Sequence, residues 1–550
     1  MKQYLVTASE MKRYDANTIE QYHMPPLLLM ERAALVTVEE LQRARGTVPC
    51  RVLVVAGTGN NGGDGLAVGR LLMLSGYEVT FVLTGSEDRC TRETARQLII
   101  LRAYGAEIFS TIKDCEYDIV IDALFGIGLS RPAKGAYADA IRLINGCRAY
   151  VCSVDIPSGV HADTGEVMGC AVQADLTVTY GFRKLGQILY PGCAYTGALV
   201  CRGMGIDGRS FLSTEPYWYT YSGRDNDVLL QRRPDGNKGT FGKALLIVGN
   251  SEIGGAALLA VKSAFRIGTG MVKVVTAVQN REILQQSVPE AMLLTYLVRH
   301  EMLCDGGSAW GDAALCGEAG VHDGNSLQGE TDGFMAKMEE AVAWADAILI
   351  GPGTGVGRQA KELLTFCLTR SMLPLVIDAD GINLLAEDSK LQEALSDRGR
   401  QGRTIVLTPH LGEFARLYGC SVMQAKAHLT EYPRELAARL KCTVVCKDAR
   451  TVVAGKDNRQ GYLNTTGNSG MATAGAGDVL AGMLTGLLAQ KMPGEEAAAA
   501  AVYLHGTAGD IAAQRETEMC MTATDIIAAI KDAALLQDAV KETESKAARK

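Results

Sequence analysis

The same order of elements occurs twice along the chain: a run of β-branched and aliphatic residues, a glycine-rich segment and an amphipathic helix. In the first half VLVVA precedes GTGNNGGDG, and later apolar runs end in IVIDA, YVCSVD and LTVTY. In the second half the corresponding runs are KALLIVG, VKVVTAV, AILIG, LVIDADG, TIVLTP and TVVCK. Apolar runs that alternate with helices are typical of parallel sheets with helices on both faces. The chain is therefore predicted to form two α/β domains.

A break in this pattern separates the two halves. The segment STEPYWYTYSGRDND is polar and aromatic and lacks the alternation. We expect a first domain at 1–214, a linker at 215–227, a second domain at 228–540 and a polar tail at 541–550. The glycine-rich, acidic stretch 304–333 contains no Lys or Arg, which predicts a surface insertion in the second domain.

Composition excludes several classes of protein. The formal net charge is -7 and no basic block is present, which argues against nucleic acid as a partner. The N-terminus lacks a signal sequence, and no uncharged apolar run approaches the ~18 residues of a membrane span, so we expect a cytoplasmic protein. The fifteen cysteines form no C-x-x-C pair and are predicted to be reduced core thiols rather than metal ligands.

Polar residues in the first half follow the apolar runs directly. The segment 57–65 opens a helix, so its backbone N–H groups can face an anion, although alone it equally fits a tight turn. Asp122 and Asp155 lie at the ends of two further predicted strands, and Ser158 follows the second. Because ligands of parallel sheets bind beyond the carboxyl ends of strands, these residues predict a site there. Ligands that are all oxygens suit a hard cation rather than zinc.

The motifs NNGGDG, DALFGIG and DIPSG, in this order, resemble the epimerase domain of the bifunctional NAD(P)H-hydrate repair enzymes. MPPLLLMERAA and ADLTVTYGFRKLG extend the resemblance over roughly residues 8 to 210. The family's proline after the motif lysine is Leu185 here, which affects the local loop. The resemblance implies a Rossmann-like, three-layer domain with a parallel sheet.

The resemblance also implies roles for single residues. Asp155 would be the acid/base group and would contact the substrate, and Asn61, Asp122 and Ser158 would bind K⁺. The hydrated dinucleotide would contact two segments, which are Asn60, Asn61, Gly62, Gly63, Asp64 and Gly126, Ile127, Gly128, Leu129, Ser130, Arg131, Pro132.

In the second half, GNSGMATAGAGDVLAGMLTG is the most specific motif. Gly475, Ala476 and Gly477 precede a predicted helix and can form an anion hole at its N-terminus, while Asp478 can accept a proton from an attacking hydroxyl. The motif resembles the ribokinase-like superfamily. Its sugar kinases carry another Asp six residues before the catalytic one, where this chain has Ala472, which argues against a carbohydrate kinase.

The strings KGTFGKALLIVGN, GPGTG, VIDADGINLL, TPHLGEF and GNSGMAT together resemble the ADP-dependent hydrate dehydratase domain of the same enzymes, over roughly residues 230 to 535. The resemblance implies that the hydrate contacts Ala256, Gly353, His410 and Asp478. The adenine nucleotide would contact Lys447, Asp448, Ala449, Arg450, Thr451 and Gly477. Two positions depart from the family pattern: Leu411 replaces a proline, and Asp448 replaces a glycine beside the nucleotide.

The resemblance implies one function for both domains. The first would interconvert the R and S epimers of hydrated NADH or NADPH, and the second would dehydrate the S epimer with ADP, releasing AMP and phosphate. The implied cofactors are K⁺ in the first domain and ADP with Mg²⁺ in the second. We expect small-molecule substrates, a homo-oligomer, and no nucleic-acid or membrane partner. Two alternatives remain open: a vitamin or sugar kinase in the second half, and a non-catalytic binding or scaffold module in the first.

Overall fold

The computed structural model describes residues 2–112, 116–222, 234–298, 326–457 and 459–548. It divides into two compact units, one of Tyr4–Tyr219 and one of Thr220–Lys550 together with Met1–Gln3. The short strand β10 (Trp218–Thr220) lies in the segment that we expected to be a linker, and residues 223–227 of that segment lie outside the described residues.

The first unit is built on a seven-stranded sheet in the order β4-β3-β2-β5-β6-β7-β9, and every pair of neighbours is parallel. This confirms the predicted parallel sheet. Its strands are β2 (Arg51–Ala56), β3 (Glu78–Leu83), β4 (Ile108–Phe109), β5 (Ile119–Ala123), β6 (Tyr150–Val154), β7 (Leu176–Tyr180) and β9 (Ala198–Arg202). Its helices are α1 (Ala8–Gln21), α2 (Pro26–Arg45), α3 (Asn60–Leu74), α4 (Arg92–Ala103) and α5 (Ala136–Gly146).

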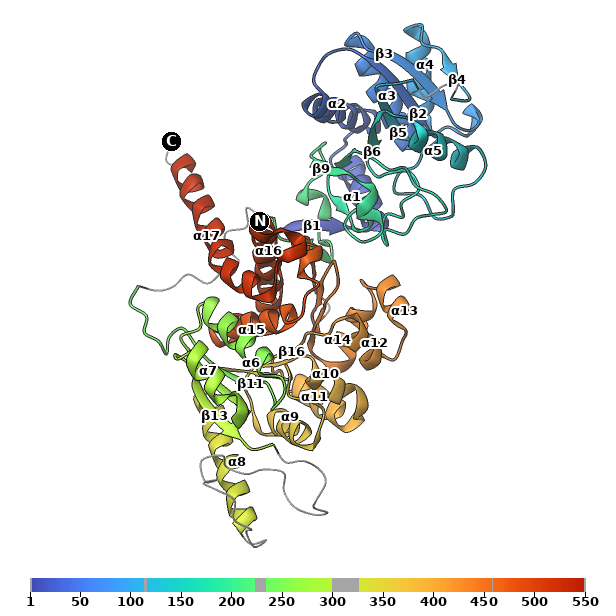
Figure 1. Ribbon diagram of the computed structural model, residues 1–550. Coiled ribbons are helices and arrows are strands. Elements are labelled where there is room, and N and C mark those ends of the chain that lie inside the picture. Colours follow the sequence, from blue (N-terminus) through green and yellow to red (C-terminus); the bar gives the residue numbers. More distant parts are fainter. Residues whose placement is uncertain (1, 113–115, 223–233, 299–325, 458, 549–550) are drawn as a thin grey trace. The chain divides into compact units, whose positions relative to one another are not determined.

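Alternate side chains of the central strands enter two separate cores, as the period of two in a strand requires. Val52 and Val54 of β2 join a core with α2, α3 and α4, whereas Leu53 and Val55 join a core with α5. Figure 1 shows α2 and α3 near β2, and α5 beside β5 and β6. Both faces of the sheet are therefore covered, which leaves the strand ends as the place for a ligand site.

Two short strands close this unit near its N-terminus. β1 (Gln3–Val6) pairs in parallel with β8 (Arg183–Lys184), with Val6 opposite Lys184. α1 follows β1 and begins with a capping box in which Thr7 and Glu10 bind each other's backbone N–H groups. The pairing of β1 with β8 joins the N-terminal strand of the unit to the segment that follows β7.

The second unit has a sheet in the order β13-β12-β11-β14-β15-β16-β17-β18-β19. The pairs from β13 to β17 are parallel, and β18 and β19 are antiparallel additions. The strands are β11 (Lys243–Ile247), β12 (Met271–Ala277), β13 (Met292–Tyr296), β14 (Ala347–Ile350), β15 (Leu375–Ile377), β16 (Ile405–Leu407), β17 (Thr443–Cys446), β18 (Val452–Ala454) and β19 (Gly461–Leu463).

The helices of this unit follow the strands in the predicted alternation. They are α6 (Gly254–Arg266), α7 (Arg281–Ser287), α8 (Ser326–Trp344), α9 (Arg358–Arg370), α10 (Asp380–Glu387), α11 (Ser389–Arg400), α12 (Leu411–Tyr418), α13 (Val422–Ala427), α14 (Tyr432–Leu440), α15 (Ala476–Ala489), α16 (Gly494–Cys520) and α17 (Ala523–Ala548). α15 packs on α6 and also contacts β11 and β14. The apolar helix after GAGD is therefore a core helix.

Three expectations about particular segments have different outcomes. The surface insertion expected at 304–333 lies outside the described residues up to residue 325, and α8 begins at Ser326. α17 continues to Ala548, so most of the residues that we expected to form a polar tail at 541–550 belong to a helix. Among the described residues, none of the helices combines the length and apolar composition that crossing a bilayer requires.

The cysteines of the described segments are free thiols, as predicted. Cys152, Cys367, Cys442 and Cys446 are buried. The other described cysteines are partly accessible, and Cys520 at the end of α16 is exposed, so the prediction of core thiols is correct only for these four.

Candidate active sites

A cavity of about 700 Å³ lies at the carboxyl ends of the central strands of the first unit. Its wall combines residues of α1, the start of α3, and the segments that follow β5, β6 and β7. The predicted site residues in this wall are Asn60, Asn61, Asp64, Gly126, Ile127, Gly128, Leu129, Ser130, Arg131 and Asp155. The fold therefore brings most of the two predicted substrate segments and the predicted acid/base group to one cavity.

Asp155 follows β6 directly and has a positive φ of 65°, which is unfavourable for a residue with a side chain. Its Oδ1 accepts hydrogen bonds from Thr179 Oγ1 at 3.0 Å and from Lys184 Nζ at 2.5 Å. Its carbonyl oxygen accepts a hydrogen bond from Gln187 Nε2 at 2.6 Å. Side chains from two later strands and the following turn thus hold this strained residue in one orientation.

Lys184 is a functional candidate that the sequence analysis missed. Its side chain is only 1% exposed, yet it lines the cavity and forms an ion pair with Asp155. Nζ also donates to Thr179 Oγ1 at 2.8 Å and to the carbonyl oxygen of Tyr180 at 3.2 Å. A buried lysine requires such compensation. The signal was its place four residues after the end of the apolar strand β7.

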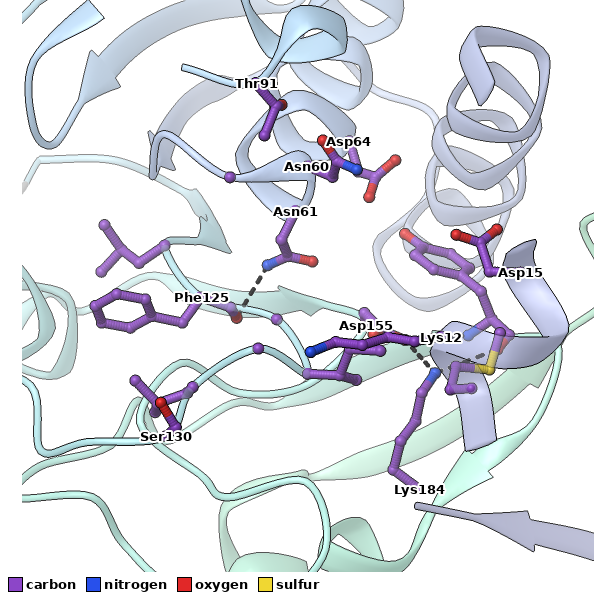
Figure 2. Close-up of a pocket in the computed structure, with 18 of the residues that line it drawn as sticks. Lys12, Asp15, Asn60, Asn61, Asp64, Thr91, Phe125, Ser130, Asp155 and Lys184 are labelled. Atoms are coloured by element: carbon purple, nitrogen blue, oxygen red, sulfur yellow. Dashed lines mark hydrogen bonds and ion pairs between the residues drawn. The ribbon is translucent and has the colours of Figure 1, made fainter. Parts of the chain in front are cut away.

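Two further carboxyl groups line the same cavity, Asp64 on α3 and Asp15 on α1 (Figure 2). Enclosure by the protein raises the pKa of Asp64 well above its usual range, and the nearby Asp155 and Asp15 raise it further, whereas Lys184 lowers it. Enclosure likewise raises the pKa of Asp15, with Asp155 adding to the effect. Asp15 was not predicted, because its motif MKRYDANTIE indicated only an amphipathic helix.

The NNGGDG segment is helical and is not a loop. α3 begins at Asn60, with Gly59 as its N-cap. A Cβ on Gly62 would lie 1.9 Å from the carbonyl oxygen of Gly57, so the helix start can pack this closely only with glycine. Gly62 and Gly63 are buried in this packing and do not line the cavity, in contrast to Asn60, Asn61 and Asp64.

The second predicted segment also has one member that the structure places elsewhere. Gly126 to Arg131 line the cavity, but Pro132 does not. Pro132 instead lies beside Gly169, whose Cβ would be 3.4 Å from that of the proline. The proline ring packs against the loop that contains Gly169 and not against the cavity.

Two of the predicted cation ligands, Asn61 and Ser158, contact the backbone of Phe125, and the third, Asp122, contacts Ser158. Asn61 Nδ2 donates to the carbonyl oxygen of Phe125 at 3.0 Å, and the Phe125 N–H donates to Ser158 Oγ at 2.9 Å. Asp122 is fully buried, and its Oδ2 accepts hydrogen bonds from Ser153 Oγ and from the Ser158 N–H, both at 2.8 Å. Burial raises the pKa of Asp122, and these hydrogen bonds oppose the rise. Asp122 therefore holds Ser158 in place.

In the second unit the candidate catalytic group is Asp478, in the first turn of α15. Gly475 is the N-cap of this helix and has a φ of 86°, which favours glycine. Burial and the nearby Asp378 raise the pKa of Asp478 to about 6, against the opposing effect of Lys447. A carboxyl group with this pKa can act as a base near neutral pH.

Lys447 directly follows β17 and its charge reaches the start of α15. Its Nζ lies 3.2 Å from the position that a Cβ on Gly477 would occupy, and it forms a 2.8 Å ion pair with Asp378. Burial lowers the pKa of Lys447, but Asp378 and Glu413 more than offset this effect and keep the pKa above its usual value. Asp378 and Glu413 were not predicted as site residues, although Asp378 follows β15 as Asp155 follows β6.

The remaining predicted residues of this unit lie at strand ends as well. His410 is the N-cap of α12, its Nδ1 accepts a 2.9 Å hydrogen bond from Gly412 N–H, and its side chain is 56% exposed. Gly353 lies against Ala256 on α6, since a Cβ at Gly353 would be 3.0 Å from that of Ala256. Asp448, Ala449, Arg450 and Thr451 form the short connection between β17 and β18.

The fold and these two sites define the class of the protein. It is a two-unit α/β enzyme with one candidate site at the strand ends of its first sheet and another beside a glycine-rich helix start in its second unit. Two family models match: one described as YjeF-related protein N-terminus over residues 27–186, and one described as NAD(P)H-hydrate dehydratase over residues 244–532.

Named relatives match nearly the whole chain. The bifunctional NAD(P)H-hydrate repair enzyme Nnr of Thermofilum pendens is 35% identical over an alignment of 536 residues, which covers 94% of each chain. Nnr of Escherichia coli is 32% identical and covers 87% of this chain and 84% of its own. The chain therefore belongs to the family of bifunctional NAD(P)H-hydrate repair enzymes. The predicted resemblance is confirmed, and the kinase and scaffold alternatives are not supported.

A solved structure is also similar to the second half. It is the ADP/ATP-dependent NAD(P)H-hydrate dehydratase of Bacillus subtilis, co-crystallised with ATP and Mg²⁺. It is 27% identical, covers 57% of this chain and 96% of its own, and has a TM-score of 0.44.

Proposed function

We propose that the first unit interconverts the R and S epimers of hydrated NADH and NADPH, and that the second unit dehydrates the S epimer with ADP to restore the cofactor. The observation that carries this proposal is the orientation of Asp155, which a buried lysine holds at the wall of a cavity large enough for a nicotinamide ring. The names of the family's members supply the substrate class.

Epimerisation needs proton transfer at the hydrate oxygen. The hydroxyl is on the ring carbon next to the ring nitrogen, so the hydrate is a carbinolamine. The nitrogen lone pair can expel the hydroxyl or the ring can open, and reversal from the other face inverts the centre. Asp155 is the group that exchanges the hydroxyl proton, for which a positioned carboxylate contributes ~10²–10⁴-fold.

The oxygen atoms around Phe125 fit a monovalent cation. Asn61 directs its amide nitrogen to the Phe125 carbonyl, which leaves Oδ1 as a ligand, and Ser158 Oγ and the Phe125 carbonyl add two more oxygens. A hard cation such as K⁺ prefers this donor set. When bound, it would hold Asn61 of α3 and the segment after β5 together. Exchange of K⁺ for a much larger inert cation should then lower epimerisation.

Dehydration needs a better leaving group than hydroxide. Asp478 accepts the proton of the hydrate hydroxyl. The hydroxyl oxygen attacks the β-phosphorus of ADP at the same time, and AMP leaves. The N–H groups at the start of α15 and the Lys447 ammonium stabilise the charge of the transferring phosphoryl group. The ring nitrogen then expels phosphate to give an iminium ion, and loss of a proton from the adjacent ring carbon to phosphate or water restores the reduced nicotinamide.

The nucleotide brings Mg²⁺ with it. In the described part of the chain, His, Cys, Asp and Glu side chains form no group of three or more that could hold a metal ion. Mg²⁺ is commonly bound through substrate phosphates and one or two carboxylates, so the arrangement agrees with a nucleotide-borne ion. The 447–451 segment and Gly477 hold the adenine nucleotide.

The test is recovery of absorbance at the reduced-nicotinamide band. With pure S hydrate and ADP, the absorbance should recover through the second unit alone. With pure R hydrate, it should recover only if the first unit also acts. We expect full recovery from either epimer with ADP and none without a nucleotide. A stable phosphorylated product, or R hydrate that never recovers, would contradict the proposal.

A further inference from the structure

We propose that Asp64 is a second catalytic residue of the epimerase, exchanging a proton with the ring nitrogen of the hydrate while Asp155 exchanges the hydroxyl proton. This inference rests on the proposed epimerisation and assigns a group that the reaction still lacks. Opening a carbinolamine needs a base on the oxygen and an acid on the nitrogen at the same time. A single carboxylate cannot do both.

The two carboxyl groups enter one cavity from different elements. Asp64 projects from α3, near the helix start that Gly57 and Gly62 pack closely, and Asp155 follows β6. Figure 2 shows Asp64 and Asp155 apart from each other, with Asp15 of α1 at another part of the wall. A ligand in this cavity can therefore meet one carboxyl group on each of two sides.

The surroundings of the two groups are unlike. Asp155 has a cation at 2.5 Å and accepts a hydrogen bond from Thr179, which suits the ionised form. Among the described residues, no side chain donates such a hydrogen bond to the Asp64 carboxyl group. The nearby Asp155 and Asp15 raise its pKa. The direction of its pKa shift agrees with a neutral acid. Environments that favour the ionised form of one carboxyl group and the neutral form of another are typical of acid–base pairs.

The other charged and titratable groups at the cavity are few. Lys184 of β8 lowers the pKa of Asp64, and Asp15 raises it. Tyr180 of β7 stays neutral, since burial raises its pKa well above the usual value against the opposing effect of the 2.6 Å hydrogen bond between its hydroxyl and Thr37 Oγ1. The other charged or titratable residues that line the cavity are Lys12, Arg131 and Tyr137.

The proton balance closes without another reactant. Asp155 takes the hydroxyl proton, the C–N bond breaks with its electron pair on nitrogen, and Asp64 protonates the nitrogen to give an open aldehyde. Rotation about the adjacent C–C bond presents the other carbonyl face. On closure the nitrogen attacks the carbonyl carbon, Asp64 recovers its proton, and Asp155 returns its proton to oxygen. Both carboxyl groups end in their starting states.

The decisive variant is Asp64→Asn, which keeps the neutral charge and size of the acid form but has no exchangeable carboxyl proton. We expect kcat for epimerisation to fall by about 10²-fold or more with KM little changed. Dehydration of pure S hydrate by the same preparation should remain at the wild-type rate, which shows that the second unit is intact. A near-normal kcat, or an effect on KM alone, overturns the proposal and leaves Asp64 as a binding group.

A second variant tests the same role without altering Asp64. Asp15→Asn removes a negative charge that raises the pKa of Asp64, so the high-pH limb of kcat/KM for epimerisation should move to lower pH. If Asp15→Asn leaves the high-pH limb of kcat/KM unchanged, the proposal is overturned, even if Asp64→Asn does not fold. Failure of the wild-type protein to epimerise would instead refute the proposed function, so the two failures are distinguishable.

Discussion

Lys184 Nζ lies 2.5 Å from Oδ1 of Asp155, although 28 residues separate them and both side chains are largely withdrawn from solvent. Asp155 ends β6, and Lys184 lies in β8, the strand that pairs with β1. The contact therefore joins the main sheet to the N-terminal edge of the unit, and it connects the stability of that edge with the orientation of the acid/base group.

Replacement of the lysine should be costly for stability. Lys184→Met leaves the Asp155 carboxylate enclosed without its cation, and breaking one partner of such a pair costs roughly 3–5 kcal/mol. The second substitution Asp155→Asn, made in the Lys184→Met background, should recover part of the lost free energy of unfolding. It should not restore epimerisation. Urea unfolding of the single and double variants measures this. Equal stabilities of the wild type and Lys184→Met would show that the pair is not coupled to folding.

Asp155→Ala should abolish conversion of the R to the S hydrate, since it removes the proton acceptor at the hydroxyl. Dehydration of S hydrate should be retained, because its residues lie in the other unit. The assay starts from pure R hydrate with ADP and follows absorbance recovery. Wild-type conversion by this variant would remove Asp155 from the mechanism.

Asp478→Asn should keep nucleotide binding but lose dehydration by about 10³-fold or more, because the amide cannot accept the hydroxyl proton. Epimerisation by the same variant serves as the control and should be unchanged. If S hydrate is still dehydrated at near-normal rates, Asp478 is only a helix-start residue and the base must be sought elsewhere.

The pH dependence of dehydration should show the pKa of about 6 at Asp478. The base must be ionised, so the rate should be full above that pH and fall about tenfold per unit below it. Initial rates with S hydrate and saturating ADP between pH 5 and 8 test this. A flat profile over that range would mean that another group sets the rate.

His505 on α16 should make the second unit sensitive to acid. Burial and the nearby Lys447 lower its pKa to about 4, and its Nε2 is buried without a hydrogen-bond partner among the described residues. Between pH 6.5 and 4 the unfolded chain binds a proton that the folded chain excludes, so stability falls as the pH falls through this window. The loss approaches roughly 3 kcal/mol at pH 4. Urea unfolding of the wild type and His505→Gln at pH 7 and pH 4.5 measures it, and equal losses in both would contradict it.

Much of the fold and of each site followed from local patterns. Apolar runs separated by glycine predicted the parallel sheets, and the carboxyl ends of those runs located Asp122 and Asp155. The glycine-rich start of a predicted helix located Asp478. Such patterns are informative because strand burial and helix starts depend on neighbours within a few residues. The segment 57–65 was predicted to open a helix, but the close packing of Gly62 on Gly57 at this helix start becomes visible only in three dimensions.

The sequence by itself determined the order of the elements, the positions of the strand-end carboxylates and, through motif resemblance, the family. Only the tertiary structure decided which charges meet: Lys184 with Asp155, Lys447 with Asp378, and Asp15 and Asp64 in one cavity. The physical reason is that burial and electrostatic interactions depend on distances through space between residues far apart in the chain. These distances, and not residue type, raise the pKa of Asp64 and Asp478 and hold Asp155 beside a cation.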